Sequence, residues 1–325
     1  MDSTFYQPPN PANWTGRVDQ AADIRFHQRV QCIDLRKEGW KHSGHKAALL
    51  GFCCDEGVRR NQGRVGAAEG PAALRKAMAS FAWHFGNDFQ LMDAGDISCL
   101  GDDLEGAQQA LANCVAAIVE QAAFPIIMGG GHETAWGSYL GLRQAIGAEA
   151  RIGIINFDAH FDLRHPVYGA NSGTPFWQMA EWCAQRDTAF SYFCLGINAT
   201  GNTSSLFAKA KELDVTYLTT EEMSQWPNAS IMAPLQAFIA QQDMLYLTID
   251  LDAFDAAFAP GVSAAAALGL WPHQILPFLE IIAVSGKLKV CDICELNPRY
   301  DIDQRTAKLG ASLIARILKF LNLFC

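Results

Sequence analysis

Six side chains in three short segments of this sequence could together hold metal ions. The segments are GGGHE (129–133), NFDAHFD (156–162) and TIDLDAFD (248–255), and each follows an apolar run typical of a buried strand. The candidate ligands are His132, Asp158, His160, Asp162, Asp250 and Asp252. Side chains at positions i, i+2 and i+4 of a strand point to one face of a sheet, so we expect these groups to converge.

The chemistry of this ligand set favours hard divalent cations. It holds two imidazoles, four carboxylates and no thiolate, which suits Mn²⁺ better than structural zinc. Four buried carboxylates could not all stay ionised without compensation, and two divalent cations would supply it. Two such ions about 3.5–4 Å apart can share a water and lower its pKa. The expected reaction is therefore hydrolysis at a planar, electrophilic carbon.

Each segment taken singly has an ordinary structural explanation. A lone D-x-D pair is more often a turn or a helix cap, and a lone histidine after glycines is usually structural. Their joint occurrence after strand-like runs favours a shared site instead. Gly129, Gly130 and Gly131 would let the chain turn sharply and bring His132 near the ions. Asp162 could both bind metal and carry a proton.

The composition narrows the class of protein. The chain has 325 residues, of which 50% are hydrophobic, and a formal net charge of −9, which argues against nucleic-acid binding. Neither a secretory signal nor a membrane-spanning apolar run is present, and the ten cysteines look like reduced thiols, so we expect a cytoplasmic protein. Cys291 and Cys294 form a C-x-x-C pair, but inside a strand-like run, which disfavours a redox or zinc motif.

Strand-like and helix-like segments alternate along the chain. Strands are expected over 45–54, 89–97, 124–130, 151–160, 190–197, 244–254 and 288–296. Helices are expected over 70–81, 102–123, 133–146, 206–213, 231–241 and 272–285, and from about 304 onward. This order predicts one α/β domain over residues 1–325, with a mostly parallel central sheet between two helical layers and an N-terminal extension over 1–45. Ligands of such sheets bind beyond the carboxyl ends of the strands, where all three motifs fall.

On these motifs the sequence resembles the ureohydrolase family, which includes arginase and agmatinase. The resemblance covers about residues 63–308 and includes APG at 259–261. It implies a three-layer α/β/α, arginase-like fold with two Mn²⁺ ions per subunit. It also implies that His132, Asp158, Asp162 and Asp250 serve one ion, and that Asp158, Asp250, His160 and Asp252 serve the other. A homo-oligomer is a further expectation.

Within the family, the details resemble the formimidoylglutamase branch of histidine degradation. The supporting segments are GGGHE, DAHFDLR (158–164), SGTPF (172–176), ELNPRYDID (295–303) and 61–75. The implied reaction converts N-formimidoyl-L-glutamate and water to L-glutamate and formamide. Asp162 would pass a proton to the departing amine, and Glu295 would hold the cationic amidine. Arg164 is the first candidate for the carboxylate end, and Arg299 and Arg64 are weaker ones. Ser172, Gly173 and Thr174 could line the pocket, although this segment is also typical of a turn.

Several residues depart from the family pattern. Ala253, Ala256 and Ala265 replace a valine and two prolines, and Trp177 stands where a polar residue is common. Phe176 lies in the neighbourhood of the catalytic histidine that arginases carry, which speaks against arginase activity. Two alternatives stay open at this point: a hydrolase of agmatine, guanidinobutyrate or another guanidino compound, and a metal-binding homologue without turnover. A dinucleotide enzyme is disfavoured because no G-x-G-x-x-G follows a first strand.

Overall fold

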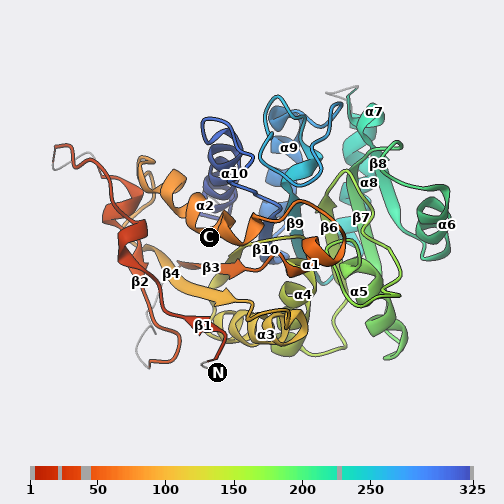
Figure 1. Cartoon of the computed structure of the whole chain (residues 1–325), viewed down its shortest axis with the longest axis horizontal. Helices are drawn as coiled ribbons and strands as arrows, with labels where there is room; N and C mark the ends of the chain where they lie inside the picture. Colours follow the sequence, from red (N-terminus) through yellow and green to blue (C-terminus); the bar gives the residue numbers. More distant parts are fainter. Residues whose placement is uncertain (1–3, 21–23, 38–44, 225–228, 323–325) are drawn as a thin grey trace.

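A twisted sheet runs through the middle of the molecule between two layers of helices (Figure 1). The computed structural model describes residues 4–20, 24–37, 45–224 and 229–322. The strands are β1 Tyr6–Gln7, β2 Gln31–Cys32, β3 His45–Cys53, β4 Phe89–Ser98, β5 Phe124–Met128, β6 Ile152–Phe157, β7 Ser191–Ile197, β8 Thr216–Thr219, β9 Met244–Asp250 and β10 Leu288–Cys294. Their order is β1-β4-β3-β5-β10-β9-β6-β7-β8, and β2 also pairs with β4.

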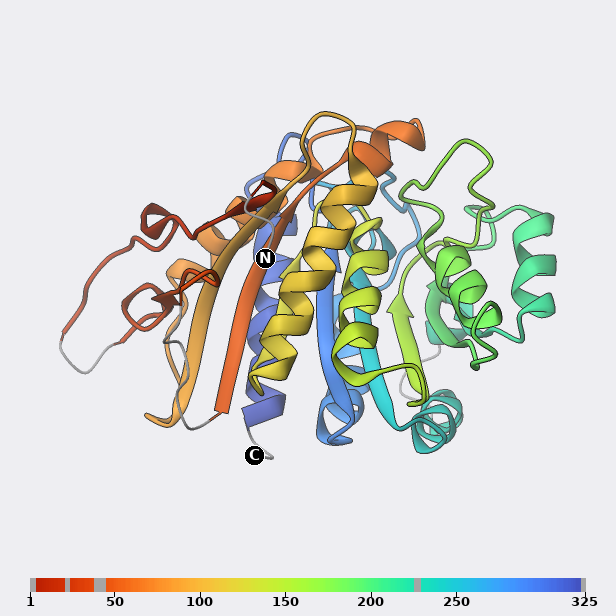
Figure 2. The same cartoon turned by 90° about the horizontal axis from the view of Figure 1, so that it is seen from below.

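The helices cover both faces of this sheet. They are α1 Glu56–Arg60, α2 Gly70–Ala79, α3 Leu104–Glu120, α4 Thr134–Ile146, α5 Pro175–Ala184, α6 Ser204–Glu212, α7 Thr220–Met223, α8 Ala229–Ala240, α9 Pro272–Val284 and α10 Arg305–Asn322. Helices α2, α8, α9 and α10 lie on one side, and α3, α4 and α5 on the other (Figures 1 and 2). The predicted three-layer α/β/α class is confirmed.

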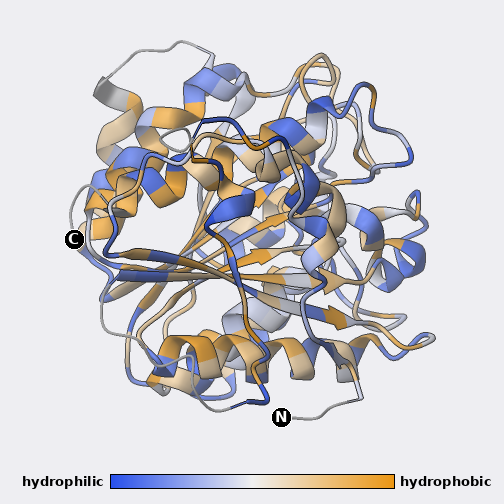
Figure 3. Ribbon diagram, turned by 90° about the vertical axis from the view of Figure 1, so that its left-hand side faces the viewer, coloured by the Kyte–Doolittle hydropathy of each residue, from blue (hydrophilic) through white to orange (hydrophobic). Residues whose placement is uncertain are grey.

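The side chains of each strand alternate between two apolar cores. In β3, Ala47 and Leu49 belong to the core beneath α2, α9 and α10, whereas Ala48 and Leu50 belong to the core beneath α3, α4 and α5. Because both faces are covered, a central strand such as β6 is apolar at almost every position and fully buried. The helices turn their hydrophobic residues toward the sheet, as Figure 3 shows. These two cores hold the strand ends in fixed positions.

Local signals explain where the helices begin. Helix α3 starts after Asp103, whose carboxylate accepts a hydrogen bond from the backbone N–H of Gly106 at 2.9 Å. Helices α2, α5 and α9 carry a proline in the first turn, where the missing N–H costs nothing. The short elements β8, α1 and α7 were not expected from the sequence, because a few residues carry too little periodicity, and the ten-residue helix α5 was not expected either.

The amino-terminal region contributes to the same sheet. The described pairings are parallel except that of β1 with β4, which is antiparallel. The predicted extension over residues 1–45 lies partly outside the described residues, namely at 1–3, 21–23 and 38–44, and its described parts place β1 and β2 beside β4. None of the described helices is long and apolar enough to cross a membrane.

Candidate metal centre

The candidate ligands lie at the carboxyl ends of neighbouring central strands. Strands β5, β10, β9 and β6 are consecutive in the sheet. His132 follows β5, the DAHFD segment follows β6, Asp250 is the last residue of β9, and Glu295 follows β10. All six predicted ligands therefore meet at one end of the sheet, as expected for a parallel arrangement.

The geometric reason for this convergence differs from the one expected. Strand alternation was predicted to align Asp158, His160 and Asp162, but β6 ends at Phe157 and these residues lie in an irregular segment. Asp162 turns back with a positive φ of 48°, a conformation rare for residues other than glycine. Asp252 likewise lies past its strand, in the 3₁₀ helix Leu251–Ala253. The convergence was predicted from strand periodicity, and that reason was wrong, because the segments after β6 and β9 turn these side chains toward one another.

His132 stands at the centre of the first group of ligands. Its Nδ1 atom lies 3.1 Å from Asp158 Oδ2, 3.0 Å from Asp162 Oδ2 and 3.1 Å from Asp250 Oδ2. The side chain is 1% exposed, and despite these neighbours Nδ1 has no hydrogen-bond partner within the described residues. A buried nitrogen facing three carboxylate oxygens out of hydrogen-bond alignment fits a site for a cation between them.

A second group forms around His160. Its Nδ1 atom lies 3.2 Å from Asp252 Oδ2 and 3.5 Å from Asp158 Oδ1. Asp158 thus presents one carboxylate oxygen to each histidine, so it lies between the two groups. Asp250 accepts the backbone N–H of Asp252 through Oδ1 at 2.7 Å and turns Oδ2 toward His132. Each group has three or more ligand atoms close enough together to hold an ion.

Backbone hydrogen bonds hold the DAHFD segment in place. Asn202 donates from Nδ2 to the carbonyl of Ala159 at 2.9 Å and accepts the N–H of Phe161 through Oδ1 at 3.0 Å. The N–H of Asp158 donates to the carbonyl of Leu195 on neighbouring β7. The segment is therefore clamped from the side of β7 and the loop that leads to α6.

All three glycines before His132 are closely packed, and a side chain at Gly129 would meet the Cys294 thiol. A side chain at Gly130 would overlap the carbonyl of Cys54, and one at Gly131 would overlap the Glu133 carboxylate. The N–H of Gly131 donates to the Cys54 carbonyl at 3.0 Å. The triple glycine thus lets the turn lie directly against the end of β3 and places His132 next to the β9 end.

Burial and the close approach of the carboxylates move the pKa values of this cluster away from their usual ranges. Burial and the Asp158 charge raise the pKa of Asp162 to about 6. Burial and the charges of Asp252 and Asp158 raise the pKa of Asp250 well above its usual range. Burial alone would lower the pKa of His132, but the three carboxylates raise it well above 6.5. The charge of Asp252 is the largest cause that raises the pKa of His160 to about 12. Divalent cations would relieve both carboxylates and histidines.

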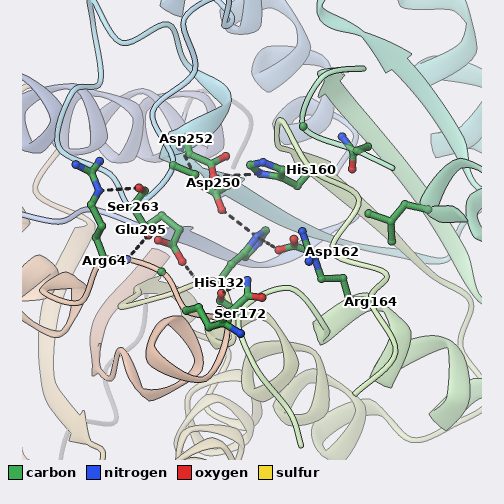
Figure 4. A pocket seen from close by; sticks show the side chains of 17 residues that line it. Arg64, His132, His160, Asp162, Arg164, Ser172, Asp250, Asp252, Ser263 and Glu295 are labelled. Atoms are coloured by element: carbon green, nitrogen blue, oxygen red, sulfur yellow. Dashed lines mark hydrogen bonds and ion pairs between the residues drawn. The ribbon is translucent and has the colours of Figure 1, made fainter. Parts of the chain in front are cut away.

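A cavity of about 270 Å³ opens above this cluster (Figure 4). Acidic groups and histidines form its inner end, and Glu295 also faces it. Glu295 is 5% exposed and has a positive φ of 66°. Its Oε1 accepts the backbone N–H of His132 at 2.9 Å, whereas Oε2 has no partner within the described residues. Glu295 therefore keeps one buried carboxylate oxygen without a partner among the described residues, next to the cavity.

The predicted substrate residues are distributed unevenly around the cavity. Arg164, Arg64 and Ser172 line it, whereas Gly173 and Thr174 do not. Thr174 Oγ1 donates to the Asn171 carbonyl, which is an ordinary turn contact. Arg299 also lies off the cavity wall and pairs with Glu69 at 2.6 Å on the surface. This placement argues against a role for Arg299, Gly173 or Thr174 in direct substrate contact through the cavity.

Sequence reasoning missed four polar residues of the cavity wall. They are Asn61, Gln62, Asn202 and Ser263. Asn61 donates from Nδ2 to Ser172 Oγ at 3.1 Å, and Ser263 Oγ accepts the N–H of Arg64 at 2.8 Å. They come from loops far apart in sequence, and no local pattern marks an asparagine or serine in such loops as a cavity residue.

Comparison with known proteins places this site in a family context. A family model described as Arginase family matches residues 45–319. The chain is 45% identical over 320 residues to a formimidoylglutamase of Aeromonas hydrophila, covering 97% of this chain and 99% of that protein. The fold is similar to a formimidoylglutamase structure from Bacillus subtilis, with a TM-score of 0.82, 22% identity and coverage of 95% of both chains. It is also similar to a Trypanosoma cruzi formiminoglutamase structure with Mn²⁺, with a TM-score of 0.75, 24% identity and coverage of 86% and 94%.

Proposed function

This chain belongs to the arginase family, and we propose that it hydrolyses N-formimidoyl-L-glutamate to L-glutamate and formamide. The observation that carries the proposal is the polarity of one cavity. Acidic side chains, two histidines and Glu295 line it together with the Arg164 side chain. The substrate carries a cationic amidine on the α-nitrogen of glutamate and two carboxylates, so the cavity offers groups of opposite sign to both kinds of charge. The 45% identical relative named formimidoylglutamase supports the same reading.

The residues of the inner end fit a pair of Mn²⁺ ions. We propose that His132, Asp158, Asp162 and Asp250 hold one ion, and that His160, Asp252, Asp158 and Asp250 hold the other. The orphaned His132 Nδ1 and Asp252 Oδ1 atoms support this assignment, because both are buried and lack partners within the described residues. When bound, the two ions would lower the pKa of a water so that it can attack at neutral pH.

The protein groups around the ions would position the substrate and move protons. The free Oε2 atom of Glu295 would accept N–H groups of the amidine and orient its carbon toward the ions. Burial and the nearby Glu133 charge raise the pKa of Glu295 well above its usual range, and a cationic amidine beside it would lower that pKa. Asp162 would carry a proton to the nitrogen of the departing glutamate.

The carboxylate end of the substrate would bind at Arg164. Within the described part of the chain, its guanidinium makes no hydrogen bond or ion pair, unlike Arg64, whose Nε and Nη2 are held by the carbonyls of Ser263 and Val262. A guanidinium can bind a carboxylate through two parallel hydrogen bonds. Ser172 and its partner Asn61 add a hydroxyl and an amide on the same wall. Arg164 therefore favours an acidic substrate over agmatine.

The experiment is an assay of the protein purified with Mn²⁺. Release of glutamate and formamide from N-formimidoyl-L-glutamate is measured beside urea release from arginine, agmatine and guanidinobutyrate. We expect glutamate release that chelation and Asp158→Ala both abolish, because Asp158 faces both histidines. Faster urea release from a guanidino compound would contradict the proposed substrate. Binding of two Mn²⁺ ions without turnover of any compound would contradict the proposed activity.

A further inference from the structure

A second cavity, of about 620 Å³, lies beside the cavity of the metal centre. This outer cavity is formed by the loop 163–171, the beginning of α5, residues of α6 and the end of α1. Four residues line both cavities, namely Asn61, Gln62, Arg164 and Leu206. In Figure 4, Arg164 lies on the opposite side of His132 from Glu295. A molecule that approaches the metal centre from the side of Arg164 therefore meets the outer cavity first.

The two cavities differ in the charge of the side chains that line them. Four acidic residues line the cavity of the metal centre: Asp162, Asp250, Asp252 and Glu295. Among the described residues, none that lines the outer cavity is acidic, and three are cationic: Arg60, Arg164 and Lys209. The whole chain has a formal net charge of −9, so the outer cavity reverses the sign of the charge locally.

The three cations differ in how far other residues neutralise them. Arg60 is held by two carboxylates, at 2.6 and 2.9 Å. Lys209 pairs with Glu212 at 2.8 Å, but the two side chains are 30% and 66% exposed, and such a pair is weak in water. Glu212 does not line the outer cavity. Because Arg164 makes no hydrogen bond or ion pair within the described part of the chain, Arg164 and Lys209 are the cations that can act on a ligand.

This charge distribution bears on which substrates reach the metal centre. Charges of one sign around a cavity with low-dielectric walls raise the local concentration of ions of the opposite sign. N-formimidoyl-L-glutamate has one amidinium and two carboxylates and therefore a net negative charge, whereas arginine and agmatine have a net positive charge. The acidic chain would repel the first compound at a distance, and the outer cavity would reverse that effect close to the metal centre.

We propose that the outer cavity selects substrates with a net negative charge, and that Lys209 is a specificity-determining residue within it. The inference rests on the proposed function and adds a role for a side chain that does not line the cavity of the metal centre. Lys209 would act at a distance through its charge, so it changes the capture of the substrate and not the reaction at the ions. Its effect should therefore appear in kcat/KM and decrease as salt screens the charge.

Charge reversal at two positions of the same helix tests this proposal. Lys209→Glu and Lys211→Glu change the net charge of the chain equally, but Lys211 does not line the outer cavity. We expect Lys209→Glu to lower kcat/KM for N-formimidoyl-L-glutamate about fivefold at about 10 mM salt and less than twofold at about 0.5 M, with kcat unchanged. Lys211→Glu should lower it less than about twofold at both. If Lys209→Glu does not fold, Lys209→Gln takes its place, with an expected loss of about twofold at low salt.

Fluorescence quenching measures the charge of the outer cavity without any turnover. Trp177 lines this cavity, so the difference between the unmodified chain and Trp177→Phe isolates its emission. At a constant ionic strength of about 0.1 M, the ratio of quenching by iodide to quenching by neutral acrylamide should be about twofold lower in Lys209→Glu than in the unmodified chain. Lys211→Glu should behave like the unmodified chain.

The outcomes separate this inference from the proposed function. If N-formimidoyl-L-glutamate is not hydrolysed, the proposed function fails, and the quenching ratios alone support or contradict a cationic outer cavity. If it is hydrolysed, equal losses of kcat/KM in Lys209→Glu and Lys211→Glu would contradict the role of Lys209. A loss in Lys209→Glu that persists at high salt would show a structural effect and contradict it as well, as would unchanged iodide quenching.

Discussion

Two buried acidic clusters of the same sheet are built in opposite ways. Asp93 on β4 is 0% exposed, and its two oxygens accept hydrogen bonds from Arg75 at 2.8 and 2.9 Å and from Trp14 at 2.7 Å. Arg75 also pairs with Asp96 at 2.6 Å. The two groups around His132 and His160 together have four carboxylates, no arginine among their described members, and orphaned polar atoms. A buried acid that serves structure is satisfied by the chain itself, whereas one that serves binding is left for a ligand to satisfy.

The largest expected effect comes from removing a carboxylate of the unsatisfied cluster. Asp250→Asn should lower the rate of hydrolysis on the order of 10⁴-fold, about 5 kcal/mol, because both metal groups lose a charge. The metal-free variant should be at least as stable as the metal-free parent, since burial and neighbouring charges disfavour the ionised Asp250. Kinetic assay and urea unfolding measure the two quantities. A metal-free variant much less stable than the parent would mean that this cluster supports the fold as Asp93 does.

Disruption of the cluster formed by Arg75, Asp93 and Asp96 should lower stability and leave metal binding unchanged. Arg75→Met leaves two carboxylates without their cation and should lower the free energy of unfolding by about 3–5 kcal/mol, with Mn²⁺ affinity unchanged. Arg299→Met is the control, because its pair with Glu69 is about half exposed and should contribute less than about 1 kcal/mol. Equal losses for the two variants in denaturant titrations would break the comparison.

Metal should stabilise the protein in a pH-dependent way. Mn²⁺ at 100 times its dissociation constant is expected to raise the free energy of unfolding by about 2.7 kcal/mol at pH 7.5. Burial and Asp158 raise the pKa of Asp162 to about 6 in the metal-free site, so below that pH a proton competes with the ion. The stabilisation should therefore be present above about pH 6 and fade as the pH falls through it. Thermal melts with and without Mn²⁺ from pH 5 to 8 measure this stabilisation. A stabilisation that does not change with pH would contradict the prediction.

The smallest expected effect concerns Arg164, which lines the cavity. Arg164→Gln should raise KM for N-formimidoyl-L-glutamate about tenfold, near 1.4 kcal/mol, with kcat changed less than about threefold. Arg299→Gln should leave both constants unchanged, since that side chain lies off the cavity wall. Steady-state kinetics of the two variants test the assignment, and an unchanged KM in Arg164→Gln would remove Arg164 from the substrate site.

The sequence predicted the features that depend on residues close together in the chain. It did not predict the contacts that depend on the order of strands in the sheet. Continuous apolar runs marked β3, β5, β6 and β9, and their polar ends marked the metal centre. Thr248 and Asp292 were not recognised as a pair, because they are neighbours only through the adjacency of β9 and β10. Asn61 and Ser172 likewise meet across 111 positions of the chain. Periodicity fixes which face a residue occupies, but strand order and loop contacts are set by tertiary packing.

The central place of β10 has a consequence for how the protein is made. Residues 288–294 are inserted between β5 and β9, although they follow both strands in the sequence. A nascent chain emerges from its amino terminus, so the six candidate ligands leave the ribosome before the strand that joins the β5 and β9 halves of the sheet. His132 and Asp250 are brought together only when that strand docks. The complete metal site is therefore expected to form only after β10 has docked between β5 and β9.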